Sequence, residues 1–214
     1  MNQPTVNDGQ RSAGTLPVVV GISGGSGAPY ARRLIQALAE SDIETHVVIS
    51  SAGAQVIQQE LGLEVESSGE NLAALFGLSA GQQTCLRWHG QHDYFTPIAS
   101  GSFRTSGMVI CPCSGGTLSA VATGASRNLL QRAAEVHLKE RRRLILVPRE
   151  TPISRVAITN MLAAHDAGAT ILPASPGWYH GVKTLDDLVD FVVARILDQL
   201  QIDNALVSRW GGCE

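Results

Sequence analysis

Short apolar runs alternate along this chain with longer amphipathic segments, and this alternation restricts the fold more than any other feature. The runs include LPVVVGI at 16–22, MVIC at 108–111 and LILV at 144–147. Strands that are apolar on both faces are typical of a parallel sheet covered by helices on both sides. A length of 214 residues fits one such unit. The sequence therefore predicts an α/β fold with a doubly wound parallel sheet in a single domain.

Periodicity and flanking glycines give the expected elements. We expect strands over residues 16–22, 45–49, 85–88, 108–111, 144–147 and 170–172. We expect helices over residues 28–39, 52–61, 72–76, 117–121, 129–139, 156–167 and 185–200. The segment 62–106 carries the weakest pattern. The domain should span 16–200, between a disordered polar arm at 1–15 and a tail at 201–214.

Composition excludes several classes of function. A net charge of −3 and an aromatic content of 5% leave no basic, base-stacking surface for nucleic acid. No apolar stretch is long enough to span a membrane, and the polar first residues lack the apolar core of a signal peptide. No cysteine or histidine spacing matches a metal-binding motif. We therefore expect a cytoplasmic protein with no metal site and no membrane segment.

The candidate site lies where the strands end, because ligands of open parallel sheets bind at the carboxyl edge. After the first strand, the loop GISGGSGA at 21–28 leads into a helix, whose amides favour an anion. The second strand is followed by Ser50 and Ser51, where a dinucleotide site would need an acid. The pattern favours a mononucleotide phosphate with Ser26 and Ser50 as hydroxyl partners; a tight turn without a ligand is the alternative.

Three later loops add chemistry to this edge. The stretch CPCSGGTLSA at 111–120 has small and hydroxyl residues that leave room for a planar ligand, or for close packing of a helix on the sheet. Arg149 and Glu150 follow LILV and suit phosphate binding and proton transfer, or a surface salt bridge. In PASPGWYH at 173–180, Trp178 and Tyr179 suit a wall around a cation, or a subunit interface.

Taken together, these loops resemble the UbiX family of flavin prenyltransferases. The matching stretches are GGSGAPYARRL, ASGSF, CPCSGGTLSAVATGASRNLLQRAAEVHLKERRRLILVPRETP, PASPGWYH, DLVDFVVARILDQL and the RW of the tail. The resemblance implies a flavodoxin-like, Rossmann-type fold and a dodecamer. It also implies transfer of a dimethylallyl group from dimethylallyl phosphate to reduced FMN. The prenylated FMN would serve UbiD-type decarboxylases, including those of ubiquinone biosynthesis.

The resemblance also assigns residues to roles. It implies FMN binding by a set of loop residues, namely Gly24, Gly25, Ser26, Ser50, Ser114, Gly115, Gly116, Thr117 and Arg149. It implies that Lys139, Tyr179 and Arg195 hold the prenyl phosphate. The implied catalytic residues are Glu60 and Glu150 for protons, Ser26 near the flavin, and Trp210 beside the prenyl group. Gly25 stands where alanine is usual, Trp178 where phenylalanine is common, and Ser51 where lysine is frequent.

The sequence leaves two alternatives to flavin prenylation. An FMN-dependent cysteine-type decarboxylase would share the fold, and a non-enzymatic flavin carrier would need no second anion site.

The stretch DDLVD at 186–190 matches the aspartate-rich motif that binds magnesium diphosphate in helical prenyltransferases. Thr184 and Asp187 instead have the spacing of a helix capping box. We therefore expect Leu185, Leu188 and Val189 to be buried and the aspartates to face water.

Overall fold

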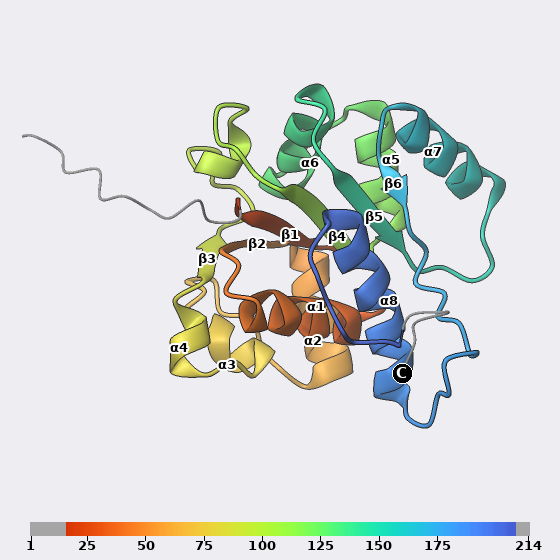
Figure 1. The fold of residues 1–214 in the computed structure, drawn as a ribbon. Helices are drawn as coiled ribbons and strands as arrows, with labels where there is room; N and C mark the ends of the chain where they lie inside the picture. Colours follow the sequence, from red (N-terminus) through yellow and green to blue (C-terminus); the bar gives the residue numbers. More distant parts are fainter. Residues whose placement is uncertain (1–15, 209–214) are drawn as a thin grey trace, which may run out of the picture.

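The computed structural model describes residues 16–208, and its core is one sheet of six parallel strands (Figure 1). The order across the sheet is β3-β2-β1-β4-β5-β6. The bounds are β1 Val18–Ile22, β2 Thr45–Ile49, β3 Leu86–His89, β4 Gly107–Cys113, β5 Leu144–Pro148 and β6 Thr170–Ile171. The predicted doubly wound α/β fold is confirmed.

The strand order reverses between β1 and β4. From β1 the chain builds outward through β2 to β3, and it then returns to the other side of β1 to build β4, β5 and β6. The connections that leave β1 and β4 therefore diverge to opposite faces of the sheet. This divergence opens a crevice at the carboxyl edge, where ligands of such sheets bind.

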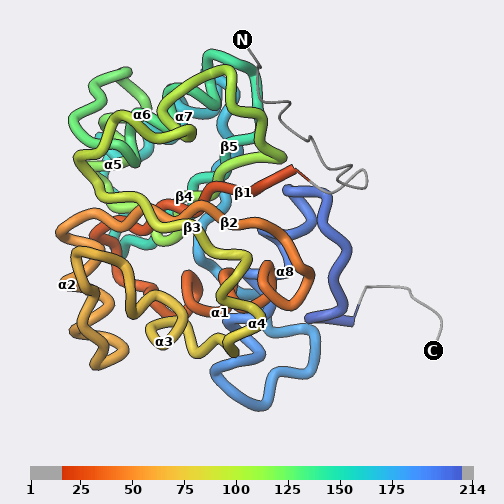
Figure 2. The backbone as a smooth tube through the Cα atoms, turned by 90° about the vertical axis from the view of Figure 1, so that its left-hand side faces the viewer, coloured from red at the N-terminus to blue at the C-terminus, as the bar shows by residue number. Residues whose placement is uncertain are grey.

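Helices cover both faces of the sheet, as Figure 2 shows edge-on. One layer holds α1 (Ala28–Glu40), α2 (Ser51–Leu61), α3 (Leu72–Phe76) and α8 (Leu185–Leu200), which pack on side chains such as Val20 and Val147. The other layer holds α5 (Gly115–Thr123), α6 (Leu129–Lys139) and α7 (Arg155–Asp166), which pack on Met108 and Leu146. Successive strand residues face opposite layers, so apolar side chains are required throughout each strand.

The expected elements agree with the structure except in the segment 62–106 and at the ends of β4 and α5. The short helices α4 (Ala80–Gln83) and η1 (Pro97–Ala99) were not expected, and both lie in the segment 62–106. Strand β4 runs two residues beyond the predicted end, through Pro112, with a shift in its pairing to β5. Helix α5 begins at Gly115, two residues before the predicted start, because Ser114 caps it by accepting a hydrogen bond from the amide of Thr117.

The ends of the predicted domain remain a proposal. Ile202 and Leu206 pack against the core beyond the end of α8. The arm at 1–15 and the last six residues, including Trp210, lie outside the described residues. Within 16–208, no helix is long and apolar enough to cross a membrane.

Gly53 lets the first turn of α2 approach the end of β1. A Cβ atom built at this position would lie 2.5 Å from the carbonyl oxygen of Ile22. That oxygen also accepts a hydrogen bond from the amide of Ser50, so it cannot move away freely. The close contact holds the start of α2 at the crevice.

We predict that Gly53→Ala lowers the free energy of unfolding by about 1–3 kcal/mol, because a rigid backbone atom opposes the new methyl group. Gly81→Ala is the matched control, since it also lies in a helix and a methyl group added there would meet nothing within 4 Å. The control should be neutral or stabilising by about 0.5–1 kcal/mol. Urea unfolding of both variants measures the difference, and equal midpoints would contradict the prediction.

Candidate active site

A buried serine joins the two sides of the crevice. The amide and hydroxyl of Ser23, directly after β1, donate to the carbonyl oxygen of Pro112 in β4 at 3.2 and 2.9 Å. The amide of Ser114 in turn donates to the Ser23 hydroxyl oxygen at 2.8 Å. Ser23 is fully buried. These hydrogen bonds fix the loop after β1 against the start of α5.

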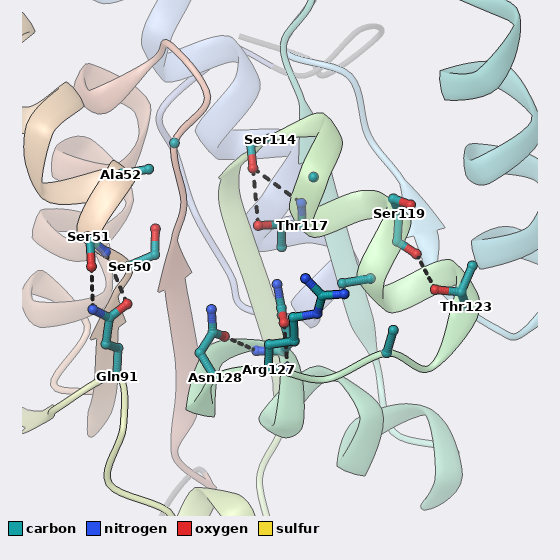
Figure 3. A pocket seen from close by; sticks show the side chains of 15 residues that line it. Ser50, Ser51, Ala52, Gln91, Ser114, Thr117, Ser119, Thr123, Arg127 and Asn128 are labelled. Carbon is teal, nitrogen blue, oxygen red and sulfur yellow. Dashed lines mark hydrogen bonds between the residues drawn. The ribbon is translucent and has the colours of Figure 1, made fainter.

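A cavity of about 630 Å³ opens beside this junction (Figure 3). It combines residues from the ends of β1, β2 and β4 with the loop before α6. The lining residues are Gly24, Ser50, Ser51, Ala52, Gln91, Ser114, Gly116, Thr117, Ser119, Ala120, Thr123, Ala125, Arg127, Asn128 and Gln131. Its size is that of a typical site for a cofactor-sized ligand.

Three helices of eight or more residues begin at this cavity. Each has a capping side chain in its wall: Ser50 for α2, Ser114 for α5 and Asn128 for α6. Within the described chain, the amides of Gly115 and Gly116 donate no hydrogen bond to protein. Free amides and aligned peptide dipoles both favour a negatively charged group. The cavity is therefore suited to an anionic ligand.

The amides at the start of α1 bind a carboxylate of the chain itself, whereas the sequence predicted a ligand anion there. The carboxylate of Glu60, on α2, accepts hydrogen bonds from the amides of Gly27 at 2.9 Å and Ala28 at 2.7 Å. Gly27 has a φ of 128°, a conformation that suits glycine. In this structure the chain's own carboxylate, instead of the expected ligand anion, satisfies these amides.

The surroundings of Glu60 stabilise its charge. Burial alone would raise the pKa of Glu60, but hydrogen bonds from Ser26, Gly27 and Ala28 and the charge of Arg149 outweigh it. The pKa of Glu60 is therefore lowered from its ordinary value. Glu60 is ionised at neutral pH and is suited to holding neighbouring groups in place.

Arg149 and Glu150 lie after β5 on the same edge. The Nε of Arg149 donates to the carbonyl oxygen of Ser26 at 3.2 Å. A Cβ built on Gly115 would lie 3.6 Å from a carboxylate oxygen of Glu150. The structure therefore brings Ser26, Glu60, Arg149 and Glu150 together beside the start of α5. Both Arg149 and Glu150 are exposed.

Lys139 is not brought to this cluster within one chain. It ends α6, whose first residues line the cavity, and 11 residues of helix separate the two ends by about 16 Å. Its Nζ lies 3.2 Å from Glu140, and a Cβ on Gly101 would lie 3.2 Å from the same nitrogen. Gly101 precedes β4, so Lys139 lies toward the opposite edge of the sheet.

Arg195 and Tyr179 face outward in one chain. Arg195 lies on the exposed side of α8 and forms an ion pair with Asp198. Its expected orientation toward the site is therefore wrong for the single chain. Tyr179, on the loop before α8, is 66% exposed and contacts the rings of His180 and Phe191 edge-on. Trp178 is exposed beside it.

The aspartate-rich stretch belongs to the start of α8. Thr184 and Asp187 form the predicted capping box, and the amides of Lys183 and Thr184 donate to Asp187 at 2.8 Å. Asp190 is paired with Arg33 at 2.7 Å instead of facing water alone. The expected burial is wrong for Leu185, which is 79% exposed, while Leu188 and Val189 are half-buried. All three lie in the first turns of α8, before its buried residues begin at Val192.

Several residues of the cavity were not predicted from the sequence. Gln91 lies in the weakly patterned segment, yet its side chain hydrogen-bonds both the amide and the hydroxyl of Ser51. Asn128 had a readable signal, since asparagine three residues before Gln131 is a helix-capping pattern. Arg127 has no local signal and reaches the cavity only through the fold.

We predict that Glu60→Ala lowers the free energy of unfolding by about 1–2 kcal/mol, because two helix-start amides lose their acceptor. Glu60→Gln is the matched control, which keeps an acceptor but removes the charge, and it should lose less. A carboxylate with a lowered pKa stabilises the fold above its unfolded pKa, and this contribution disappears as pH falls through the folded value. Thermal midpoints of wild type and Glu60→Ala should therefore converge in acid, as the pH falls through the lowered pKa of Glu60; a gap that stays constant with pH would contradict the assignment.

Comparison with known proteins identifies the family. The family model described as Flavoprotein matches residues 7–197. A flavin prenyltransferase UbiX from Alkalihalophilus pseudofirmus is 49% identical over 194 residues, covering 91% of this chain and 96% of the relative. Among solved structures, AnUbiX in complex with FMN and dimethylallyl pyrophosphate is 37% identical with a TM-score of 0.82, covering 94% of this chain and 100% of that one.

A second solved structure is described as a dodecameric FMN-dependent UbiX-like decarboxylase from Escherichia coli O157:H7. It is 39% identical with a TM-score of 0.79, and it covers 92% of this chain and 100% of its own. Similarity of this degree extends over almost the full length of each relative and includes the loops that form the crevice. The chain belongs to the flavoprotein family, among the flavin prenyltransferases of the UbiX type.

Proposed function

We propose that this protein transfers a dimethylallyl group from dimethylallyl phosphate to reduced FMN. The proposal rests on one observation: two different kinds of site adjoin each other at one crevice. The amide-rich cavity between α2, α5 and α6, whose lining holds no acidic residue among those described, adjoins the charged cluster of Ser26, Glu60, Arg149 and Glu150. The first suits a flavin nucleotide, and the second suits a reacting phosphate ester.

The cavity fits a flavin mononucleotide in size and in polarity. Its hydroxyl and amide groups match a ribityl chain and a phosphate, and Ser50 and Ser51 offer no acid for a second ribose. The reduced flavin supplies the nucleophile to which the prenyl group becomes attached. Gly24, Gly25, Ser114, Gly115, Gly116 and Thr117 form the surfaces that would orient it.

Glu150 is the better placed of the two acids for proton transfer. Within the described chain it forms no hydrogen bond or ion pair, and it is open to solvent beside Gly115. Glu60 is held by three donors and is ionised, so its role is to fix Ser26 and the start of α1. We propose that Glu60 thereby fixes Ser26 beside the place where the flavin ring would lie.

Arg149 is the cation of this cluster that can receive the departing phosphate. Its guanidinium group lies at the carboxyl edge beside Ser26. A guanidinium group can bind two oxygens of one phosphate at the same time. Stabilising the leaving anion favours departure of the phosphate. Tyr179 and Trp210 are proposed to shelter the allyl cation that results, since aromatic faces attract cations.

The remaining phosphate ligands require a second copy of the chain. Lys139 and Arg195 do not reach the cluster of their own subunit, yet both are presented on its surface. Helix α7 also exposes Val156, Ile158 and Leu162. We therefore propose a homo-oligomer, as in the dodecameric relative, in which Lys139 and Arg195 complete a neighbour's site.

The other functions explain fewer of these residues. A cysteine-type decarboxylase or a flavin carrier would bind FMN, but neither requires the cluster around Arg149 and Glu150. The product is proposed to serve a UbiD-type decarboxylase in the cytoplasm. No nucleic-acid or membrane partner is proposed, consistent with the net charge of −3.

We predict that anaerobic incubation with reduced FMN and dimethylallyl phosphate yields a flavin heavier by one prenyl unit. The reaction should proceed in excess EDTA, because the proposed phosphate ligands are cationic side chains. Mass spectrometry of the released flavin measures the product, and Glu150→Gln should reduce its formation to background with FMN still bound. An unmodified flavin together with carbon dioxide release from a peptidyl cysteine would favour the decarboxylase.

We predict that Lys139→Ala and Glu150→Gln are each inactive alone but regain activity when co-expressed. A mixed assembly would contain some sites with both residues intact, giving about a quarter of wild-type activity if copies mix at random. Co-expression of Glu150→Gln with Glu150→Ala is the control and should stay inactive. A mixture of Lys139→Ala and Glu150→Gln that stays inactive would place both residues in the same subunit's site.

A further inference from the structure

Arg127 is the one cationic side chain among the described residues that line the cavity. It lies on the short connection between α5 and α6, one residue before the cap of α6. In Figure 3 its side chain extends from this connection into the space between Asn128 and Thr117. No acidic residue belongs to the lining within the described part of the chain.

The guanidinium group of Arg127 has no protein partner within residues 16–208, although its backbone amide donates to Gln131 at 2.8 Å. Arg33 and Arg142, in contrast, have protein partners: Arg33 pairs with Asp190, and Arg142 donates to the carbonyl oxygen of Phe103. A cation directed into a polar cavity without a counter-charge is suited to an anionic ligand.

The surroundings of Arg127 reinforce this charge. The capped starts of α2, α5 and α6 all contribute to the same walls, and the amide of Gly116 is free of partners from residues 16–208. A Cβ on Gly116 would meet nothing within 4 Å, so a ligand atom can approach that backbone. Positive dipole ends and one full positive charge therefore surround the same space.

Arg149 does not serve this space. It is absent from the cavity lining, and its guanidinium group donates to the carbonyl oxygen of Ser26 within the electrostatic reach of Glu60. A phosphate bound between α2, α5 and α6 therefore has Arg127 as its available cation, whereas Arg149 remains free for the second phosphate ester.

We propose that Arg127 binds the phosphate of the flavin nucleotide and makes the protein select FMN over riboflavin. The proposal rests on the proposed function, since it names the charge that recognises that substrate. A charge-assisted, bidentate contact stabilises a phosphate much more than a neutral hydroxyl. Arg127 is thus a specificity-determining residue for the phosphorylated end of the flavin, remote from the reacting ring.

The test compares FMN with riboflavin as ligands of the purified protein, using quenching of flavin fluorescence. Arg127→Gln should raise the Kd for FMN by about 10- to 100-fold, the loss expected for one charged contact, and leave the Kd for riboflavin within about twofold. Arg127→Lys should recover part of the FMN affinity, because it restores the charge without the planar fork. Arg155→Gln, an exposed arginine at the start of α7, is the matched control and should change neither Kd.

Two results would overturn the proposal: an unchanged Kd for FMN in Arg127→Gln, or an equal loss for FMN and riboflavin. The second result would mean that Arg127 shapes the cavity without recognising phosphate. Failure of the proposed function gives a different pattern. In that case Arg127→Gln would still weaken the binding of FMN and leave the binding of riboflavin unchanged, while the wild-type protein would form no prenylated flavin.

Discussion

Ser23 ties together the two strands from which the chain diverges to opposite faces of the sheet. Its hydroxyl donates to Pro112 on β4 and accepts from the amide of Ser114, so one buried side chain fixes both loops. Two rigid loops at the reversal of strand order keep the crevice open without help from a ligand. The arrangement of α2, α5 and α6 around the cavity depends on this junction, because α5 starts directly at Ser114.

The crevice has two regions, which differ in whether their helix-start amides already bind a carboxylate of the chain. At the start of α1 the amides are already satisfied by Glu60, which also holds Ser26 and lies near Arg149. At the start of α5 the amides have no partner among the described residues, and Arg127 is close by. An internal carboxylate in one region excludes a ligand phosphate there and directs it to the other. In the proposed function, this division keeps the nucleotide phosphate apart from the place where the second phosphate ester reacts.

The sequence predicted the fold well because the strands are buried on both faces and must be apolar throughout, as in LILV at 144–147. It also predicted the loops that bear Ser26, Ser114 and Arg149, since the carboxyl ends of parallel strands share an edge. It could not predict that Glu60 closes the start of α1, because that contact joins residues 33 positions apart through packing of α1 and α2. Gln91 and Arg127 were missed for the same reason: their roles arise from tertiary position.

The free amides of the cavity couple the stability of the folded protein to the binding of its ligand. Helix-start amides that have no protein partner in the native state can bind an anion, and the unfolded chain offers no such arrangement. A ligand that binds only the native state at 100 times its Kd stabilises that state by about 2.7 kcal/mol. Since a difference of this size alters how much chain is degraded, the cellular supply of flavin would set the abundance of the protein as well as its turnover.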